Sequence, residues 1–157
     1  MKNEWTKTLL YVYKYLERVC EGIDKLVDES AMNSFYYRRS GHENNVVDIA
    51  NRIIELTDRK TKLINIKVLV DNCLLKLDRL YAQLLIEKYI DEEISDRIAL
   101  KHGLNVRTYF RKSSQAENTF TNLMSKEGFN DEKLNTYLSS EKWIVEVYEK
   151  FKQGSLS

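Results

Sequence analysis

Proline is absent from this 157-residue chain, and glycine occurs five times. These two residues supply most of the tight turns of β-sandwiches and β-barrels, so their scarcity excludes an all-β fold. Cysteine is also scarce: Cys20 and Cys73 each lie in an apolar helical pattern, and their spacing is not that of a paired motif. We therefore expect two buried thiols in a reducing cytosol rather than a disulfide framework.

Long apolar runs are missing too. None approaches the roughly 20 residues of a membrane-spanning helix, and the first residues lack the apolar segment of a secretory leader. We expect a soluble, cytoplasmic protein with no membrane contact. Charge is nearly balanced, with 25 Lys and Arg against 24 Asp and Glu. Any surface for a nucleic acid must therefore arise from local clustering of charge.

Signatures of catalysis do not occur. The two histidines, His42 and His102, are far apart in the sequence, and no Cys or carboxylate spacing forms a metal site. There is no phosphate-binding loop, dinucleotide fingerprint or nucleophile elbow. We predict a protein that is not an enzyme, with no catalytic residue, no cofactor and no metal. His102 is expected to end a short helix, where an imidazolium meets the carbonyl dipole.

What the chain does contain is helical periodicity. A heptad-like seam predicts a helix at about residues 4–29, packed against another helix of the same chain or of a second subunit. Packing within the chain is the favoured alternative. The seam comprises Trp5, Leu9, Val12, Leu16, Val19, Ile23 and Leu26.

Residues 30–45 lose the helical period and are predicted to form a loop. Their aromatic residues and the pair Arg38 and Arg39 could contact nucleic acid, although such a patch more often packs against neighbouring helices. The apolar period returns at Val46, falters over residues 58–62 and then resumes. This pattern predicts further helices.

The overall prediction is an all-α helical bundle in three regions. Residues 1–76 would form long helices with a surface for dimerisation, and residues 77–128 a DNA-binding domain. Residues 129–157 would form a helical tail, split near Ser139. Within the middle region, Asp78 is expected to act as the N-cap of a helix at 78–90, since its carboxylate can accept free amide hydrogens.

A short helix is predicted next, at about residues 92–102. Asp91 would be its N-cap, which places Glu92 in its first turn. Ile94 and Ile98 are expected to face inward.

A tight turn and a second helix follow. Gly103 lies four residues after Ala99, which is the spacing of a helix-turn-helix. The helices cross closely enough that only a small side chain fits at Ala99, and glycine adopts the left-handed turn at little cost. Leu104 would fill the angle between the helices, and Asn105 would cap the second one. The buried face of that helix is predicted to comprise Tyr109, Ser113, Ala116, Phe120 and Leu123.

Positive charge concentrates around this turn. Residues 97–116 contain no Asp or Glu, and five cations. These are Arg97, Lys101, Arg107, Arg111 and Lys112. Such a local basic face is expected where a recognition helix enters the major groove. We therefore predict a helix-turn-helix at about residues 92–116.

Three segments carry a family resemblance: 84–89, 94–104 and 107–112. Together they resemble region four of bacterial sigma factors. They are more similar to the ArpU/RinA-like phage transcriptional regulators of Gram-positive bacteria, whose recognition helix has a comparable Arg-Thr-aromatic-aromatic-Arg-Lys run. The resemblance implies a transcription regulator, often an activator of phage late genes. Asp78 stands where the family often has proline, and the tail after Gly128 is longer. No sigma region two is present, so unaided promoter melting is not implied.

Each candidate residue has an expected role. Arg107, Thr108 and Arg111 would contact base edges in the major groove. The others would contact phosphates or set the register on the duplex. They are Arg97, Lys101, Asn105, Lys112, Ser114 and Gln115. The expected partners are double-stranded DNA, RNA polymerase and a second copy of the chain.

Two other functions stay open at this point. A small-terminase-like phage packaging protein is also helical and binds DNA, but its DNA-binding motif usually opens the chain. A purely helical interaction protein or inhibitor would bind a protein partner and no DNA.

Overall fold

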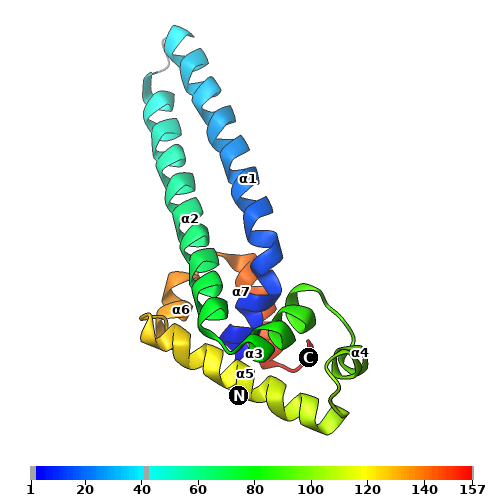
Figure 1. The fold of residues 1–157 in the computed structure, drawn as a ribbon. Helices are drawn as coiled ribbons and strands as arrows, with labels where there is room; N and C mark the ends of the chain where they lie inside the picture. The colour runs from blue at the N-terminus through cyan, green and yellow to red at the C-terminus, as the bar shows by residue number, and fades with distance from the viewer. Residues whose placement is uncertain (1–2, 41–42, 157) are drawn as a thin grey trace. The chain divides into compact units, whose positions relative to one another are not determined.

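The computed structural model describes residues 3–40 and 43–156, and the side chains of residues 3–33 and 46–156. Over these ranges the backbone forms helices and turns and no strand, which confirms the all-α prediction. The elements in Figure 1 are α1 (Glu4–Ser40), α2 (Glu43–Lys76), α3 (Arg79–Leu85), the π-helix η1 (Ile86–Ile90), α4 (Ser95–Lys101), α5 (Val106–Lys126), α6 (Asp131–Tyr137) and α7 (Lys142–Lys152). In the described ranges, none of these helices combines the length and apolarity needed to span a bilayer.

The chain divides into two compact units. Unit 1 consists of Met1–Lys14 and Lys67–Ser157, and unit 2 of Tyr15–Ile66. The predicted regions 77–128 and 129–157 both fall in unit 1, together with the two ends of the predicted N-terminal region.

Unit 1 is built around the first turns of α1. The Trp5 ring stacks on the Tyr148 ring of α7, with centroids 4.3 Å apart, and its indole Nε1 donates to Asn135 Oδ1 of α6 at 2.9 Å. Leu9 and Val12 are fully buried. The predicted apolar seam therefore packs within its own chain here, as expected.

Unit 2 is a helical hairpin. Residues 15–40 of α1 and 43–66 of α2 run side by side in opposite directions (Figure 1). Lys60 of α2 forms an ion pair with Asp24 of α1, with Nζ and Oδ1 2.6 Å apart. The seam continues through buried Leu16 and Ile23, but Leu26 is 39% exposed.

The predicted loop at residues 30–45 was wrong over its described part. Helix α1 runs on to Ser40, and α2 begins at Glu43. Residues 30–40 contain no proline or glycine, and an established helix gains one hydrogen bond for each residue added. Loss of apolar period therefore did not end the helix. The side chains of Arg38 and Arg39 lie outside those that the structure describes, and so does their predicted contact with nucleic acid.

The faltering period at 58–62 also produced no break, since α2 is continuous to Lys76. Neither cysteine is in a disulfide, as predicted; Cys73 is buried as expected, but Cys20 is only half-buried.

The predicted helix at 78–90 consists of two parts, α3 and then one π-helical turn, η1. Asp78 occupies the N-cap position of α3, but its side chain accepts no hydrogen bond from the helix, so the predicted capping bond was wrong. The tail is split between α6 and α7, as predicted near Ser139.

Candidate nucleic-acid interface

Helices α4 and α5 are joined by a short left-handed turn. Gly103 has φ +68°, a conformation that glycine adopts without a steric cost. The Leu104 N–H donates to the Ala99 carbonyl at 2.9 Å, which closes the end of α4. The Asn105 side chain accepts from the Thr108 N–H at 2.8 Å and caps α5. The predicted roles of Gly103 and Asn105 in the turn are confirmed.

A small apolar cluster fixes the two helices. Leu84 of α3, Ile98 and Ala99 of α4, and Tyr109 of α5 are buried together. Leu104 packs against this cluster from the turn, and so does Leu80 from α3. The predicted positions of Ala99 and Leu104 are confirmed. Because three helices share this core, the start of α5 is held on a rigid support.

The predicted start of the short helix was wrong. Helix α4 begins at Ser95, and Asp91 instead ends the preceding η1, with its N–H donating to the Ile86 carbonyl at 2.9 Å. Glu92 has φ +54°, so it lies outside any helix. Ile94, expected to face inward, is 67% exposed. Residues 91–94 therefore form the non-helical link between η1 and α4.

The buried face of α5 follows the prediction closely. Tyr109, Ser113, Ala116 and Phe120 are all buried. Leu123 is only half-buried, and Met124 is the fully buried residue at that end of the helix.

The opposite face of α5 is open to solvent at its start. Arg107, Arg111 and Ser114 are exposed, and Arg97 is exposed on α4. Thr108, which was expected to face outward, is half-buried, and its backbone N–H donates to the Asn105 cap. Lys112 is also half-buried.

The sequence analysis did not predict two apolar residues on this open face. Val106 is 44% exposed and Phe110 is 48% exposed. They lie one helical turn apart on α5 and directly beside Arg107 and Arg111. The spacing gave a signal, since Phe110 lies three residues after Arg107 and so shares its face. The Phe110 ring also packs edge-on against the buried Tyr109 ring, with centroids 5.1 Å apart.

Carboxylates from outside residues 97–116 reduce the positive charge near the turn. Lys101 Nζ lies 3.3 Å from Glu93 and 3.4 Å from Glu87. Its hydrogen bond to Glu93 raises the pKa of Lys101, and the bond to Glu87 adds to this effect. His102, at the end of α4 as predicted, lies 2.8 Å from Glu87. Charge counting along the sequence could not detect these pairs, because η1 brings Glu87 to the end of α4.

Gln115 is exposed but already has a partner. Its Oε1 accepts from the Tyr81 hydroxyl at 2.8 Å, which links α5 to α3. A phosphate contact by Gln115 would therefore use the amide nitrogen.

A buried polar pair ties η1 to α5. Glu117 is 6% exposed and accepts a hydrogen bond from the Tyr89 hydroxyl at 2.7 Å. Lys88 Nζ lies 3.7 Å from the same carboxylate. Burial raises the pKa of Tyr89, and the adjacent Glu117 raises it further. Nothing in the sequence pattern indicated this pair, since a glutamate inside a helix is ordinarily exposed.

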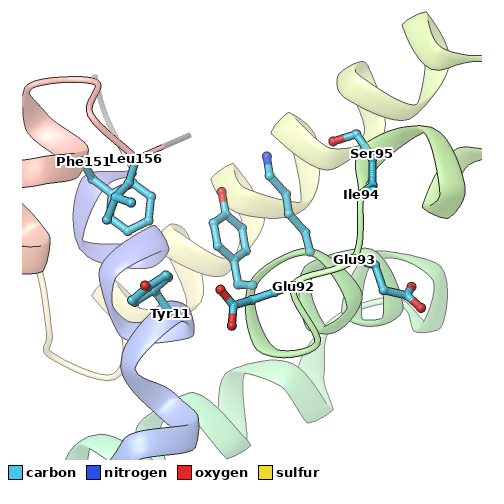
Figure 2. Close-up of a pocket in the computed structure, with 9 residues that line it drawn as sticks. Tyr11, Glu92, Glu93, Ile94, Ser95, Phe151 and Leu156 are labelled. Atoms are coloured by element: carbon cyan, nitrogen blue, oxygen red, sulfur yellow. The ribbon is translucent and has the colours of Figure 1, made fainter.

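A cavity of about 350 Å³ lies next to this pair. Figure 2 shows Tyr11 of α1 beside the non-helical residue Glu92, with Phe151 of α7 at one side of the view and Ile94 at the other. Lys88 and Tyr89 also line it, so the two residues that reach Glu117 form part of the cavity wall.

Among the described residues, no group of three or more His, Cys, Asp and Glu side chains could hold a metal ion. Comparison with protein-family models, curated proteins and solved structures gave no match.

Proposed function

We propose that this protein is a sequence-specific, DNA-binding transcription regulator of phage or prophage origin. In this proposal α4 and α5 form a helix-turn-helix that docks on promoter DNA, with RNA polymerase as a further partner. One observation carries it: Arg107 and Arg111 are exposed on the first turns of α5, which begins after a left-handed turn at Gly103. Because the start of α5 is braced by a three-helix core, both guanidinium groups are presented without ordering a loop.

The open face of α5 has the chemistry for direct contact with bases. An arginine that donates two hydrogen bonds to guanine O6 and N7 contributes about 1–3 kcal/mol of discrimination. Val106 and Phe110 lie beside the arginines and suit the thymine methyl group, the apolar feature of the major groove. We therefore assign Arg107 and Arg111 to guanines and Phe110 to a neighbouring thymine.

The remaining candidates would position the protein on the phosphates. Arg97, Lys112 and Ser114 flank the open face and can donate to phosphate oxygens. Lys101 would have to exchange its partners Glu93 and Glu87 for a phosphate, so we expect it to contribute less than an unpaired lysine. Asn105 keeps its capping bond and offers its amide nitrogen.

The proposal is tested with a library of duplexes that carry about 20 randomised base pairs, enough for two half-sites one helical turn apart. Bound duplexes are selected and their affinity is measured by fluorescence anisotropy at several salt concentrations. Arg107→Ala and Arg111→Ala should each weaken binding to the selected duplex by roughly 10-fold or more, with a smaller change for random DNA. Lys150→Ala on α7 is the control cation and should leave affinity unchanged. Equal binding by all three variants would refute the assignment.

The thymine contact has its own test. A selected duplex is resynthesised with uracil in place of thymine, which removes only the methyl groups. The wild-type protein should lose affinity by a few-fold, as expected for one apolar contact of about 1 kcal/mol. Phe110→Ala should bind the two duplexes equally well. A wild-type protein that does not distinguish them would remove Phe110 from the contact set.

Light scattering separates this proposal from the two alternatives. A ring of many subunits would indicate a packaging protein. Failure to select any duplex, together with a stable complex with another protein, would indicate an interaction protein or inhibitor.

A further inference from the structure

The cavity beside η1 belongs entirely to unit 1 and has the size of a small-molecule site. Its volume of about 350 Å³ lies within the range of natural ligand pockets, about 300–1,000 Å³. Tyr11, Phe151 and Leu156 lie at one side of Figure 2, and Ile94 and Ser95 lie at the other. The DNA-binding proposal makes no use of this cavity.

Three aromatic rings meet at the first of these sides. The Phe151 ring is edge-on to the Tyr11 ring, with centroids 5.9 Å apart, and to the Tyr89 ring, with centroids 6.3 Å apart. Tyr89 and Phe151 are buried, and Leu156 adds an aliphatic side chain to the lining. Aromatic rings pack favourably edge-on or offset against one another. This part of the cavity therefore suits a flat apolar ring.

Two carboxylates line the cavity, and both are already engaged. Glu92 forms an ion pair with Lys14. Glu93 accepts a hydrogen bond from Lys101, with Oε2 and Nζ 3.3 Å apart. An organic cation would have to compete with one of these lysines. The carboxylates therefore do not favour a cationic ligand.

Lys88 is the charged residue of the lining that keeps its hydrogen-bond donors free. Its side chain is only 18% exposed, and the carboxylate of Glu117 lies 3.7 Å from Nζ, beyond hydrogen-bond distance. The same carboxylate instead accepts from the Tyr89 hydroxyl. An ammonium group has three donors, and buried donors are ordinarily satisfied. Among the described residues no acceptor reaches Lys88 Nζ, so the cavity offers an unfilled place for an oxygen acceptor.

We propose that this cavity binds a small aromatic carboxylate. The ring packs against Phe151 and Leu156, and the carboxylate accepts hydrogen bonds from Lys88 Nζ. A carboxylate is preferred to an alcohol because a hydrogen bond between two ions is roughly twice as strong as one between neutral groups. Glu117 reduces the positive charge at Lys88, so a ligand of minimal size binds weakly. The inference stands independently of DNA binding.

Benzoate and benzylamine are the probes, because they share a ring and differ in the sign of their charge. In proton–nitrogen NMR spectra of the full chain, benzoate should shift resonances of η1 and α7 with a dissociation constant of roughly 1–10 mM, as expected for so small a ligand. Benzylamine should bind roughly 10-fold more weakly or worse, because its ammonium would face Lys88. Nuclear Overhauser effects from the benzoate ring to Phe151 and Leu156 locate the bound ring.

Three results of this titration would overturn the proposal. They are the absence of shifts up to about 50 mM benzoate, equal binding of the two probes, and Overhauser contacts that lie only elsewhere on the chain. The first would leave the cavity to water alone.

Variants of the buried pair test the role of Lys88. Glu117→Gln removes the carboxylate that competes for the ammonium but keeps an acceptor for Tyr89, so it should tighten benzoate binding by roughly 3-fold or more. Lys88→Met/Glu117→Gln removes both charges, leaves neither buried alone, and should weaken benzoate binding roughly 10-fold or more. Lys67, whose Nζ lies 5.8 Å from the centroid of the Tyr13 ring, is a matched lysine outside the cavity lining, and Lys67→Met should leave the affinity unchanged.

Circular dichroism checks that each variant remains helical. An unchanged affinity in the double variant, or a loss of affinity in Glu117→Gln, would overturn the assignment of Lys88. If the double variant does not fold, the Glu117→Gln affinity and the Overhauser contacts decide the assignment.

Discussion

The two units of this protein differ in how much apolar surface their helices bury. Unit 1 brings segments from both ends of the sequence around one core, to which α1, α5 and α7 contribute buried aromatic residues such as Trp5 and Phe120. Unit 2 is a hairpin of two helices with a small core, and several of its described large apolar side chains are exposed. The candidate DNA surface lies in the unit with the larger core.

The difference indicates that the helix carrying the candidate DNA contacts needs a rigid support. An arginine can distinguish bases only if its helix is held in place, and the core beneath Tyr109 supplies that support. In the hairpin, by contrast, six large apolar side chains among those described are exposed. Five measurements can break or sharpen this comparison.

Loss of a core aromatic should give the largest effect. Phe120→Ala in unit 1 removes a fully buried ring and should lower the free energy of unfolding by about 3–5 kcal/mol. Met32→Ala in unit 2, at a position that is 70% exposed, should change it by less than about 0.5 kcal/mol. Urea denaturation followed by circular dichroism measures both. Similar losses for the two variants would show that the units do not differ in this way.

The second largest effect should come from removing a buried polar pair in unit 1, compared with an exposed ion pair in unit 2. Tyr89→Phe removes the hydroxyl that donates to buried Glu117 and should cost about 1–3 kcal/mol of unfolding free energy. Asp24→Asn removes an exposed partner of Lys60, and since water and salt screen that pair, stability should barely change. The comparison is made by urea denaturation at low salt. A larger loss for Asp24→Asn would contradict it.

The same substitution should have opposite signs at two glycines. Gly103→Ala places a side chain at φ +68° and should destabilise unit 1 by about 1 kcal/mol or more. Gly22→Ala lies within α1 in unit 2, where an added Cβ meets nothing within 4 Å, and should stabilise the helix by about 0.5–1 kcal/mol. Thermal melts report both signs. A gain in stability from Gly103→Ala would show that the turn is not left-handed in solution.

The fourth comparison involves no change in stability: the two thiols should differ in their rate of chemical labelling. Burial raises the pKa of Cys73 from 9.0 to about 11, which lowers its thiolate fraction near pH 8 by roughly 100-fold. Labelling with a disulfide reagent should therefore modify half-buried Cys20 first. Equal rates at pH 8 would indicate that unit 1 opens as readily as unit 2.

Cys73 also gives a pH dependence with a defined sign. Its folded-state pKa lies above the ordinary value, so the stability it contributes is present below pH 9 and is lost as the pH rises towards about 11. The wild-type protein should lose more unfolding free energy over this range than Cys73→Ala does. Urea titrations at pH 8 and pH 11 measure the difference, and an equal loss would contradict it.

Local patterns in the sequence were sufficient for much of the candidate site. The Gly103 turn, the Asn105 cap and the buried face that begins at Tyr109 were predicted, because each depends on residues within one or two helical turns. The start of α4 was not, since a π-helical turn at η1 depends on how Leu84 and Tyr89 pack. The loop predicted at residues 30–45 failed for another reason: loss of apolar period does not by itself end a helix.

Contacts between distant residues could not be predicted. The partners of Lys101, including Glu87, and the burial of Glu117 beside Tyr89 depend on the packing of α4 and α5 against η1. Charge counting over 97–116 therefore overstated the positive charge available to a phosphate. The exposed Phe110 was overlooked for a different reason: its spacing from Arg107 was visible in the sequence, but an aromatic residue next to Tyr109 looks like core until the helix is oriented.

By itself, the sequence determined that this chain is helical, that a glycine turn separates α4 from α5, and which face of α5 is buried. Hydrogen bonds and side-chain periods within a helix act over a few residues, so composition and spacing decide them. Tertiary structure alone decided where α4 begins, which carboxylates pair with Lys101, and which apolar side chains of unit 2 are exposed. Those properties depend on which helices meet, and helices distant in the sequence meet only when the chain has folded.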